Sequence, residues 1–239
     1  MKQSSNTEIK FLEIDSKIIE YQVFGDISND IPVLILLHEG LGSIAMWRKI
    51  PELIHLKTKL NVFVYSRFGY GKSSTIRLPR PTNYMSIEAE EYLPKIIKSL
   101  SIKNYFLIGH SDGGTIASIG SKSKNIEQLL GTILIAPHFF VEQESINAIE
   151  DISYQYKYKN LKSKLERFHN DVDNAFWGWS DVWLSSDFKN WNILKYLPQI
   201  KTPILALQGT NDPYGTINQI NILEQKVRGP FDKVVIKDC

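Results

Sequence analysis

A single serine stands in a setting that suits nucleophilic chemistry. The apolar run 105–108 is typical of a buried strand, Gly109-His110-Ser111-Asp112-Gly113 follows it, and a helical pattern covers 115–119. A serine at a sharp strand-to-helix turn holds its hydroxyl above a sheet, and glycines are needed beside it because the backbone passes close to itself. The pattern alone also fits a glycine-rich turn. With a strand before it and a helix after it, it indicates that Ser111 is a nucleophile.

A carboxylate at a comparable place could orient the base that such a serine needs. Asp212 lies just past the apolar strand expected over 203–208, in the turn Gly209-Thr210-Asn211-Asp212-Pro213. Functional loops of open α/β sheets lie at the carboxyl ends of the strands. An Asp before proline also has a common structural role in turns. Beside a serine nucleophile, we expect Asp212 to be the orienting acid.

The negative charge that forms during acyl transfer needs backbone donors. The first amide after the nucleophile, that of Asp112, is one expected donor. The second is expected from the loop His38-Glu39-Gly40-Leu41-Gly42 after the third strand, where Gly40 allows close approach. This loop also reads as a glycine-rich turn into the next helix, and the two interpretations are compatible.

The elements that must position these residues alternate between strand and helix. Apolar runs predict strands over 9–14, 17–24, 33–37, 61–66, 105–108, 130–136, 203–208 and 233–237. Helical patterns cover 47–56, 85–100 with Ser86 as N-cap, the stretch after Ser111, and 216–227. Continuous rather than alternating apolar runs favour an α/β fold with a mostly parallel sheet flanked by helices.

Residues 137–197 differ from the rest of the chain. They are rich in aromatic and charged residues, lack a strand-like run, and predict helices near 142–158, 161–169, 173–179 and 183–196. We expect a helical cap here, inserted into a core formed by 1–136 and 198–239. Trp179 and Trp183 are candidates for an apolar substrate pocket, or else pack the cap onto the core.

Composition excludes several classes of function. Net charge is +2, with 43% hydrophobic and 23% charged residues, so nothing favours binding to nucleic acid or to an anionic membrane. No apolar run is long enough to span a bilayer, and the N-terminus lacks a signal-peptide core. Cys239 is the one cysteine, which fits a reducing compartment and a cytoplasmic location. No metal-ligand spacing and no nucleotide-binding glycine loop is present, so we expect no cofactor.

On these motifs the chain resembles the α/β-hydrolase superfamily. In layout it is similar to the capped serine esterases and the meta-cleavage-product hydrolases of that superfamily. The matching pieces are 37–43, 65–73, the turn at Ser111, the segment 137–197, and 208–212. Glu39 departs from the commoner His-Gly of the family's first loop. The resemblance implies cleavage of a carboxylic ester or a related acyl or C–C bond in a small-molecule substrate. Epoxide hydrolases and haloalkane dehalogenases carry Asp where Ser111 stands, whereas a cofactor-free haloperoxidase would use the same residues.

The resemblance also implies a histidine base on a loop after the last strand, where this sequence reaches Asp238 and Cys239. We therefore expect the base to lie beyond residue 239, and the chain as given to have little hydrolase activity and an exposed apolar strip. Of the five histidines, His138 is the one expected near the mouth of the site. A non-catalytic, ligand-binding protein of the same fold is the alternative.

Overall fold

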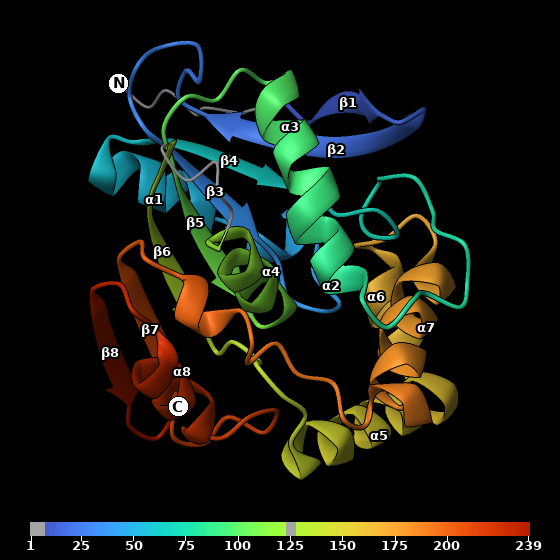
Figure 1. The fold of residues 1–239 in the computed structure, drawn as a ribbon. Coiled ribbons are helices and arrows are strands. Elements are labelled where there is room, and N and C mark those ends of the chain that lie inside the picture. The colour runs from blue at the N-terminus through green and yellow to red at the C-terminus, as the bar shows by residue number, and fades with distance from the viewer. Residues whose placement is uncertain (1–7, 123–127) are drawn as a thin grey trace.

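The fold is a single eight-stranded sheet with helices on both faces (Figure 1), seen in a computed structural model that describes residues 8–122 and 128–239. The strand order is β1-β2-β4-β3-β5-β6-β7-β8. The strands are β1 (Lys10–Ile14), β2 (Lys17–Phe24), β3 (Val33–Leu37), β4 (Asn61–Tyr65), β5 (Tyr105–His110), β6 (Leu129–Ile135), β7 (Ile204–Gly209) and β8 (Phe231–Ile236). Strands β1, β2 and β4 pair antiparallel, and every pairing from β4 to β8 is parallel. The expected fold class is confirmed.

The helices divide between the two faces of the sheet and the segment between β6 and β7. They are α1 (Ile50–Thr58), α2 (Tyr84–Ile87), α3 (Leu93–Ser99), α4 (Asp112–Gly120), α5 (Gln143–Tyr158), α6 (Leu161–Glu166), α7 (Val172–Trp183) and α8 (Asn218–Lys226). A π-helical turn, Glu88–Tyr92, joins α2 to α3. Figure 1 shows α3 and α4 in front of the sheet, with α5, α6 and α7 grouped to its right and lower right.

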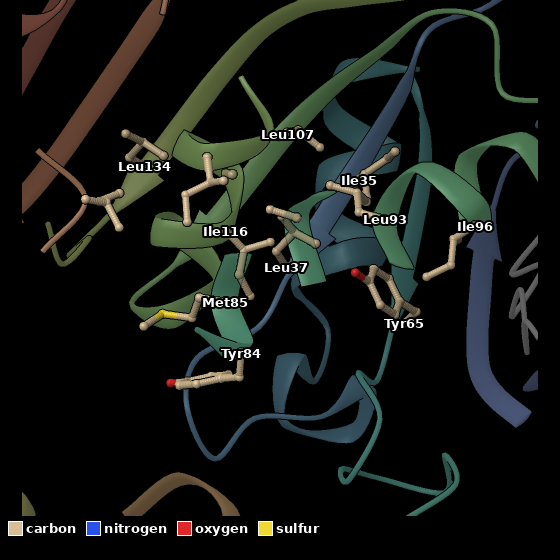
Figure 2. Packing of buried hydrophobic residues seen from close by; sticks show 14 of the residues in the cluster. Ile35, Leu37, Tyr65, Tyr84, Met85, Leu93, Ile96, Leu107, Ile116 and Leu134 are labelled. Carbon is tan, nitrogen blue, oxygen red and sulfur yellow. The ribbon is translucent and has the colours of Figure 1, made fainter. Parts of the chain in front are cut away.

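Alternation along the central strands explains why both faces are covered. In β3, Ile35 and Leu37 belong to the larger hydrophobic cluster, whereas Leu34 and Leu36 belong to a second cluster on the other side. Successive side chains of a strand point to opposite faces, so a fully apolar strand needs a cover on each. Figure 2 shows the larger cluster, where Ile35, Leu37 and Leu107 of the sheet lie beside Leu93 and Ile116 of the helices.

Local backbone chemistry fixes the first hairpin. Asp15 and Ser16 join β1 to β2 with φ values of 51° and 62°. Two consecutive residues with positive φ form the kind of two-residue turn whose twist matches that of paired strands. The expected hairpin at Asp15-Ser16 is confirmed.

Three sequence-based predictions about helices were wrong. Ser86 is inside a helix that begins at Tyr84, so it is not an N-cap. The helix expected over 47–56 begins at Ile50, because Arg48 has φ 51° and Pro51 occupies the first turn. No helix covers 183–196. Beyond a short 3-10 turn, Ser186–Phe188, Asn192 forms a β-bridge with Phe140 and the amide of Ile193 donates to Phe139 O at 2.8 Å.

The inserted segment is joined to the sheet by buried aromatic side chains. Trp179, Trp183 and Phe188 are 6%, 2% and 0% exposed and belong to the same hydrophobic cluster as β3 and α4. Tyr156 of α5 stacks on Phe176 of α7 at a centroid distance of 3.7 Å. Over the described residues, none of the helices has the length and apolar character needed to cross a membrane.

Candidate active site

Ser111 lies between β5 and α4 in a strained backbone conformation. Its φ is 53° and its ψ −117°, a region that residues with a side chain rarely adopt. Its amide donates to Ile135 O at 2.9 Å, and its carbonyl accepts from the Gly114 amide at 2.8 Å. Within the described residues the hydroxyl makes no hydrogen bond, and the residue is half-buried. The turn therefore holds Ser111 from both sides while its side chain stays free.

The flanking glycines are required by close packing of backbone. A Cβ at Gly109 would overlap Gly113 O, and one at Gly113 would overlap Leu37 O. At Gly114 a Cβ would lie 3.0 Å from Pro137 Cβ. The strand-to-helix turn is thus wedged between β3 and the chain that leaves β6, which explains the glycine spacing around Ser111.

Asp212 lies at the same edge of the sheet as Ser111. Strands β5, β6 and β7 are adjacent and parallel, with Ala136 N donating to Leu207 O at 2.9 Å. Strands β5 and β7, which lead to Ser111 and Asp212, are two strand spacings apart, or about 10 Å. The Asp212 carboxylate accepts from Gln208 Nε2 at 2.9 Å and from the Tyr214 amide at 2.8 Å. These contacts fix the carboxylate in its turn, which is half-buried.

The loop expected to supply an oxyanion donor is braced by His38 and by a buried arginine. His38 Nδ1 lies 2.7 Å from Glu39 O, and the Arg67 amide donates to His38 Nε2 at 3.1 Å. Burial and the positive charge of Arg67 lower the pKa of His38 well below its usual value, so the ring stays neutral. Gly40 itself lies directly under the indole of Trp179, and a Cβ there would overlap Trp179 Nε1.

Asp112 combines the first helical amide of α4 with a buried carboxylate. The amides of a first helical turn have no partner within the helix, so this N–H is available beside Ser111. The Tyr84 hydroxyl donates to Asp112 Oδ2, and Trp183 Nε1 donates to Tyr84 at 3.1 Å. Arg67 Nη1 lies 3.9 Å from the same Oδ2. Asp112 Oδ1 is buried, and it has no hydrogen-bond partner among the residues that the structure describes.

Comparison with known proteins agrees with this geometry. Residues 32–120 match the family model described as alpha/beta hydrolase fold. This range contains the Gly40 loop, the loop after β4 and the Ser111 turn. The chain has the α/β-hydrolase fold, and its sequence matches the model of that family over these residues. None of the curated proteins matches the sequence significantly.

Solved structures of this α/β-hydrolase fold superpose over nearly the whole chain. MGS-M2, an alpha/beta hydrolase from a Medee basin deep-sea metagenome library, has a TM-score of 0.75 at 17% identity, covering 96% of this chain and 90% of its own. A structure from work on carboxylesterases of Nitrososphaera gargenis has the same TM-score and coverages at 16% identity. The enol-lactonase from Burkholderia xenovorans LB400 has a TM-score of 0.70 at 15% identity, covering 95% and 90%.

The five histidines of the chain hold different structural positions. His169 accepts from the Gly71 amide at 3.0 Å and its Nε2 lies 3.0 Å from Leu41 O, so it ties the inserted segment to two loops of the core. His55 Nδ1 lies 2.7 Å from Leu60 O, and His110 Nδ1 lies 3.6 Å from Glu39 Oε2. Among the described residues, none of the five forms a hydrogen bond with Ser111.

His138 is the histidine between the two candidate catalytic residues. It follows β6, which lies between the strands that lead to Ser111 and Asp212, and it is 3% exposed. Its ring meets that of Trp183 edge to face at a centroid distance of 5.2 Å. His138 Nδ1 is buried and has no hydrogen-bond partner within residues 8–122 and 128–239. Burial lowers the pKa of His138, against the opposing charges of Asp112 and Asp212.

Two elements of the site escaped prediction from the sequence. Arg67 and Tyr84 both contact Asp112, yet they are distant in sequence and belong to no motif that names their partner. One signal was present, because Arg67 follows β4, whose residues are all buried, and a cation at such a place needs partners. No cluster of potential metal ligands occurs among residues 8–122 and 128–239.

Proposed function

We propose that this α/β-hydrolase is a serine hydrolase that cleaves a carboxylic ester, open or cyclic, or a related acyl or C–C bond. Ser111 supplies the nucleophile, Asp212 orients the base, and the amides of Gly40 and Asp112 bind the oxyanion. One observation carries the proposal: Ser111 stands at positive φ, with an unbonded hydroxyl, at the sheet edge that also holds Asp212.

The activities named for three structural relatives support the proposed ester or lactone substrate. The work on Nitrososphaera gargenis concerns carboxylesterases, the Burkholderia enzyme is an enol-lactonase, and Est816 is described as an N-acyl homoserine lactone degrading enzyme. Esters and lactones share an acyl carbon that a serine attacks. The proposed substrate is therefore a small acyl compound, with no cofactor.

The proposed reaction proceeds in two halves. The Ser111 hydroxyl attacks the acyl carbon as a base removes its proton, and the tetrahedral oxyanion is stabilised by the two amides. The same base returns the proton to the departing alkoxide, leaving an acyl-serine ester. Water, deprotonated by the base, then releases the acid and restores the hydroxyl.

We propose that the base is a histidine that follows Cys239. The position of Cys239 supports this proposal, because its carbonyl accepts a hydrogen bond from the Asn211 amide at 2.7 Å. The polypeptide at 239 thus runs beside the turn that carries Asp212. A histidine a few residues further would meet the acid without crossing the sheet.

Fluorophosphonate labelling tests the nucleophile in the chain of residues 1–239. We expect slow labelling that free imidazole in solution accelerates, because imidazole replaces the base, and no labelling of Ser111→Ala at any imidazole concentration. Equal labelling of the wild type and Ser111→Ala would refute the serine assignment.

Two further outcomes distinguish the alternatives. If labelling is fast without imidazole and is lost in His138→Gln, the base lies within the described chain. A wild-type chain that resists labelling in all conditions, while folded by circular dichroism, favours the ligand-binding alternative.

A further inference from the structure

A small cavity near α2 is unusually rich in cations. Its volume is about 170 Å³, and it lies between the β1–β2 hairpin, the loop after β4, the stretch 76–81 and the start of the α2–α3 helical run. Lys17, Arg67, Arg77 and Arg80 line it, against the one carboxylate of Glu88. Because a water molecule occupies about 30 Å³, the cavity has room for about five waters or one small ion.

Arg80 is a buried cation whose hydrogen bonds go to neutral groups. It is 9% exposed, and it donates to the Tyr70 hydroxyl at 2.9 Å and to Phe68 O at 3.0 Å. Its guanidinium also lies over the rings of Tyr70 and Tyr84, 4.9 and 5.0 Å from their centroids. In the described part of the chain it forms no ion pair. A buried charge of this kind is costly without a counter-ion.

The charges of Arg67 and Glu88 only partly compensate each other. Arg67, 2% exposed, donates to Glu39 O at 2.8 Å, and its Nη1 lies 3.9 Å from Asp112 Oδ2, too far for a hydrogen bond. Glu88 accepts from the Tyr65 hydroxyl at 2.7 Å. Arg77 is exposed at the mouth of the cavity. Lys17 is half-buried there, and its Nζ lies 5.4 Å from the centroid of the Phe68 ring. Among the described residues, four cationic side chains and one carboxylate therefore line the same small space.

We propose that this cavity binds a small oxyanion, a carboxylate or a phosphate. A planar guanidinium matches two oxygens of either group, and partial burial strengthens such pairs. Arg80 forms the floor contact, and Arg77 and Lys17 neutralise the oxyanion at the mouth. The long aliphatic parts of these side chains leave room for a ligand of only a few heavy atoms.

The cavity also touches the support of the candidate active site. Tyr84 and Arg67 line it, and both contact the carboxylate of Asp112, next to Ser111. An oxyanion that attracts Arg67 weakens its pairing with Asp112. This coupling rests on the proposed function, whereas binding in the cavity does not.

Thermal unfolding with added salts tests the binding. Sodium phosphate and sodium acetate are titrated in a non-coordinating buffer, with sodium chloride at matched ionic strength as reference. We expect saturable stabilisation by at least one of the two oxyanions and none by chloride, and the active salt identifies the class. In Arg77→Gln/Lys17→Gln the apparent Kd should rise about fivefold, because both cations at the mouth are lost.

Arg228→Gln is the matched control, because Arg228 is exposed and does not line the cavity. It should leave the Kd unchanged. Arg80→Gln should abolish saturable binding, with circular dichroism checking its fold. Stabilisation that does not saturate, that chloride reproduces, or that survives unchanged in the double variant would overturn the proposal. Because no readout involves Ser111, failure of the serine mechanism leaves this test intact.

Discussion

The turn that carries Ser111 and the turn that carries Asp212 are held in different ways. Around Ser111, backbone is wedged against backbone, with Gly109 and Gly113 leaving no room for a Cβ. Around Asp212 the chain packs against residues 238 and 239 rather than against the core strands: a Cβ at Gly209 would overlap Cys239 O. Single hydrogen bonds, such as Asn211 N to Cys239 O at 2.7 Å and Asp238 N to Thr210 Oγ1 at 2.9 Å, complete this support. The first turn is packed within the core, and the second is held by residues 238 and 239.

This difference predicts how far the effect of a substitution in each of the two turns should spread. Packing against neighbouring backbone leaves no low-cost rearrangement, so a change at the Ser111 turn acts on the whole fold. A lost hydrogen bond in the half-exposed Asp212 turn is replaced in part by water. The two turns should therefore differ in the size and in the spread of mutational effects.

Gly113→Ala should give the largest effect. The new Cβ would overlap Leu37 O, so we expect the free energy of unfolding to fall by about 3 kcal/mol in urea titrations. Gly120→Ala in the same helix is the control, since its Cβ would sit 3.5 Å from Leu107 Cδ1, an ordinary contact, and Ala favours helix. Equal stability of the two variants would contradict the wedge.

Tyr84→Phe should follow in size. It removes the hydroxyl that donates to the buried Asp112 carboxylate and accepts from Trp183, at a cost of about 1–3 kcal/mol in unfolding free energy. Tyr154→Phe, at a side chain that is 53% exposed, should change nothing measurable. If both variants unfold alike, Tyr84 does not support the Ser111 turn.

Stability should decrease as the pH is lowered from about 6.5. Burial lowers the pKa values of His38, His138 and His169 below the reference of 6.5, so the unfolded chain takes up protons that the folded chain does not. Folding stability is thus complete above 6.5 and falls by up to about 1.4 kcal/mol per pH unit for each histidine. Urea titrations at pH 7.5 and 5.5 measure this, and His138→Gln should reduce the slope. A slope of opposite sign would contradict the burial of neutral histidines.

Thr210→Val tests the looser turn. Losing the hydroxyl that accepts from the Asp238 amide should cost less than about 1 kcal/mol globally. Amide hydrogen exchange should accelerate over 210–214 and stay unchanged over 111–115. Equal acceleration in both stretches would show that the turns open together.

The smallest effect on stability is expected at the sheet edge. Val234, Val235 and Ile236 of β8 are 39–45% exposed, in agreement with the apolar strip expected from the sequence. Val234→Thr/Ile236→Thr should reduce binding of a dye specific for exposed apolar surface, with unfolding free energy within about 0.5 kcal/mol of wild type. Unchanged dye binding would assign the signal to another surface.

Sequence reasoning succeeded where a local pattern determines the structure. The bounds of β2 and β3, the hairpin at Asp15-Ser16 and the strand-to-helix turn at Ser111 follow from apolar runs and turn residues alone. These elements depend on neighbours within a few positions. The sheet edge shared by Ser111 and Asp212 followed from parallel topology, although their catalytic roles stay predictions.

Sequence reasoning failed where contacts between residues far apart in the sequence determine the structure. The stretch 183–196 has helical residues, but its backbone pairs with 139–141 instead, as the bridge from Phe140 to Asn192 shows. The partners of Asp112 come from the loop after β4 and from α2, and no spacing in the sequence joins them. Buried polar networks are set by the assembled fold, so their members emerge only when the elements are in place.

The indole of Trp179 resting on Gly40 carries a mechanical consequence. Helix α7 cannot lift from the sheet without uncovering the backbone of the loop beneath it, and that loop cannot shift upward while the ring is seated. Under the proposed function, access to the backbone amide of Gly40 is therefore coupled to the position of this one aromatic side chain.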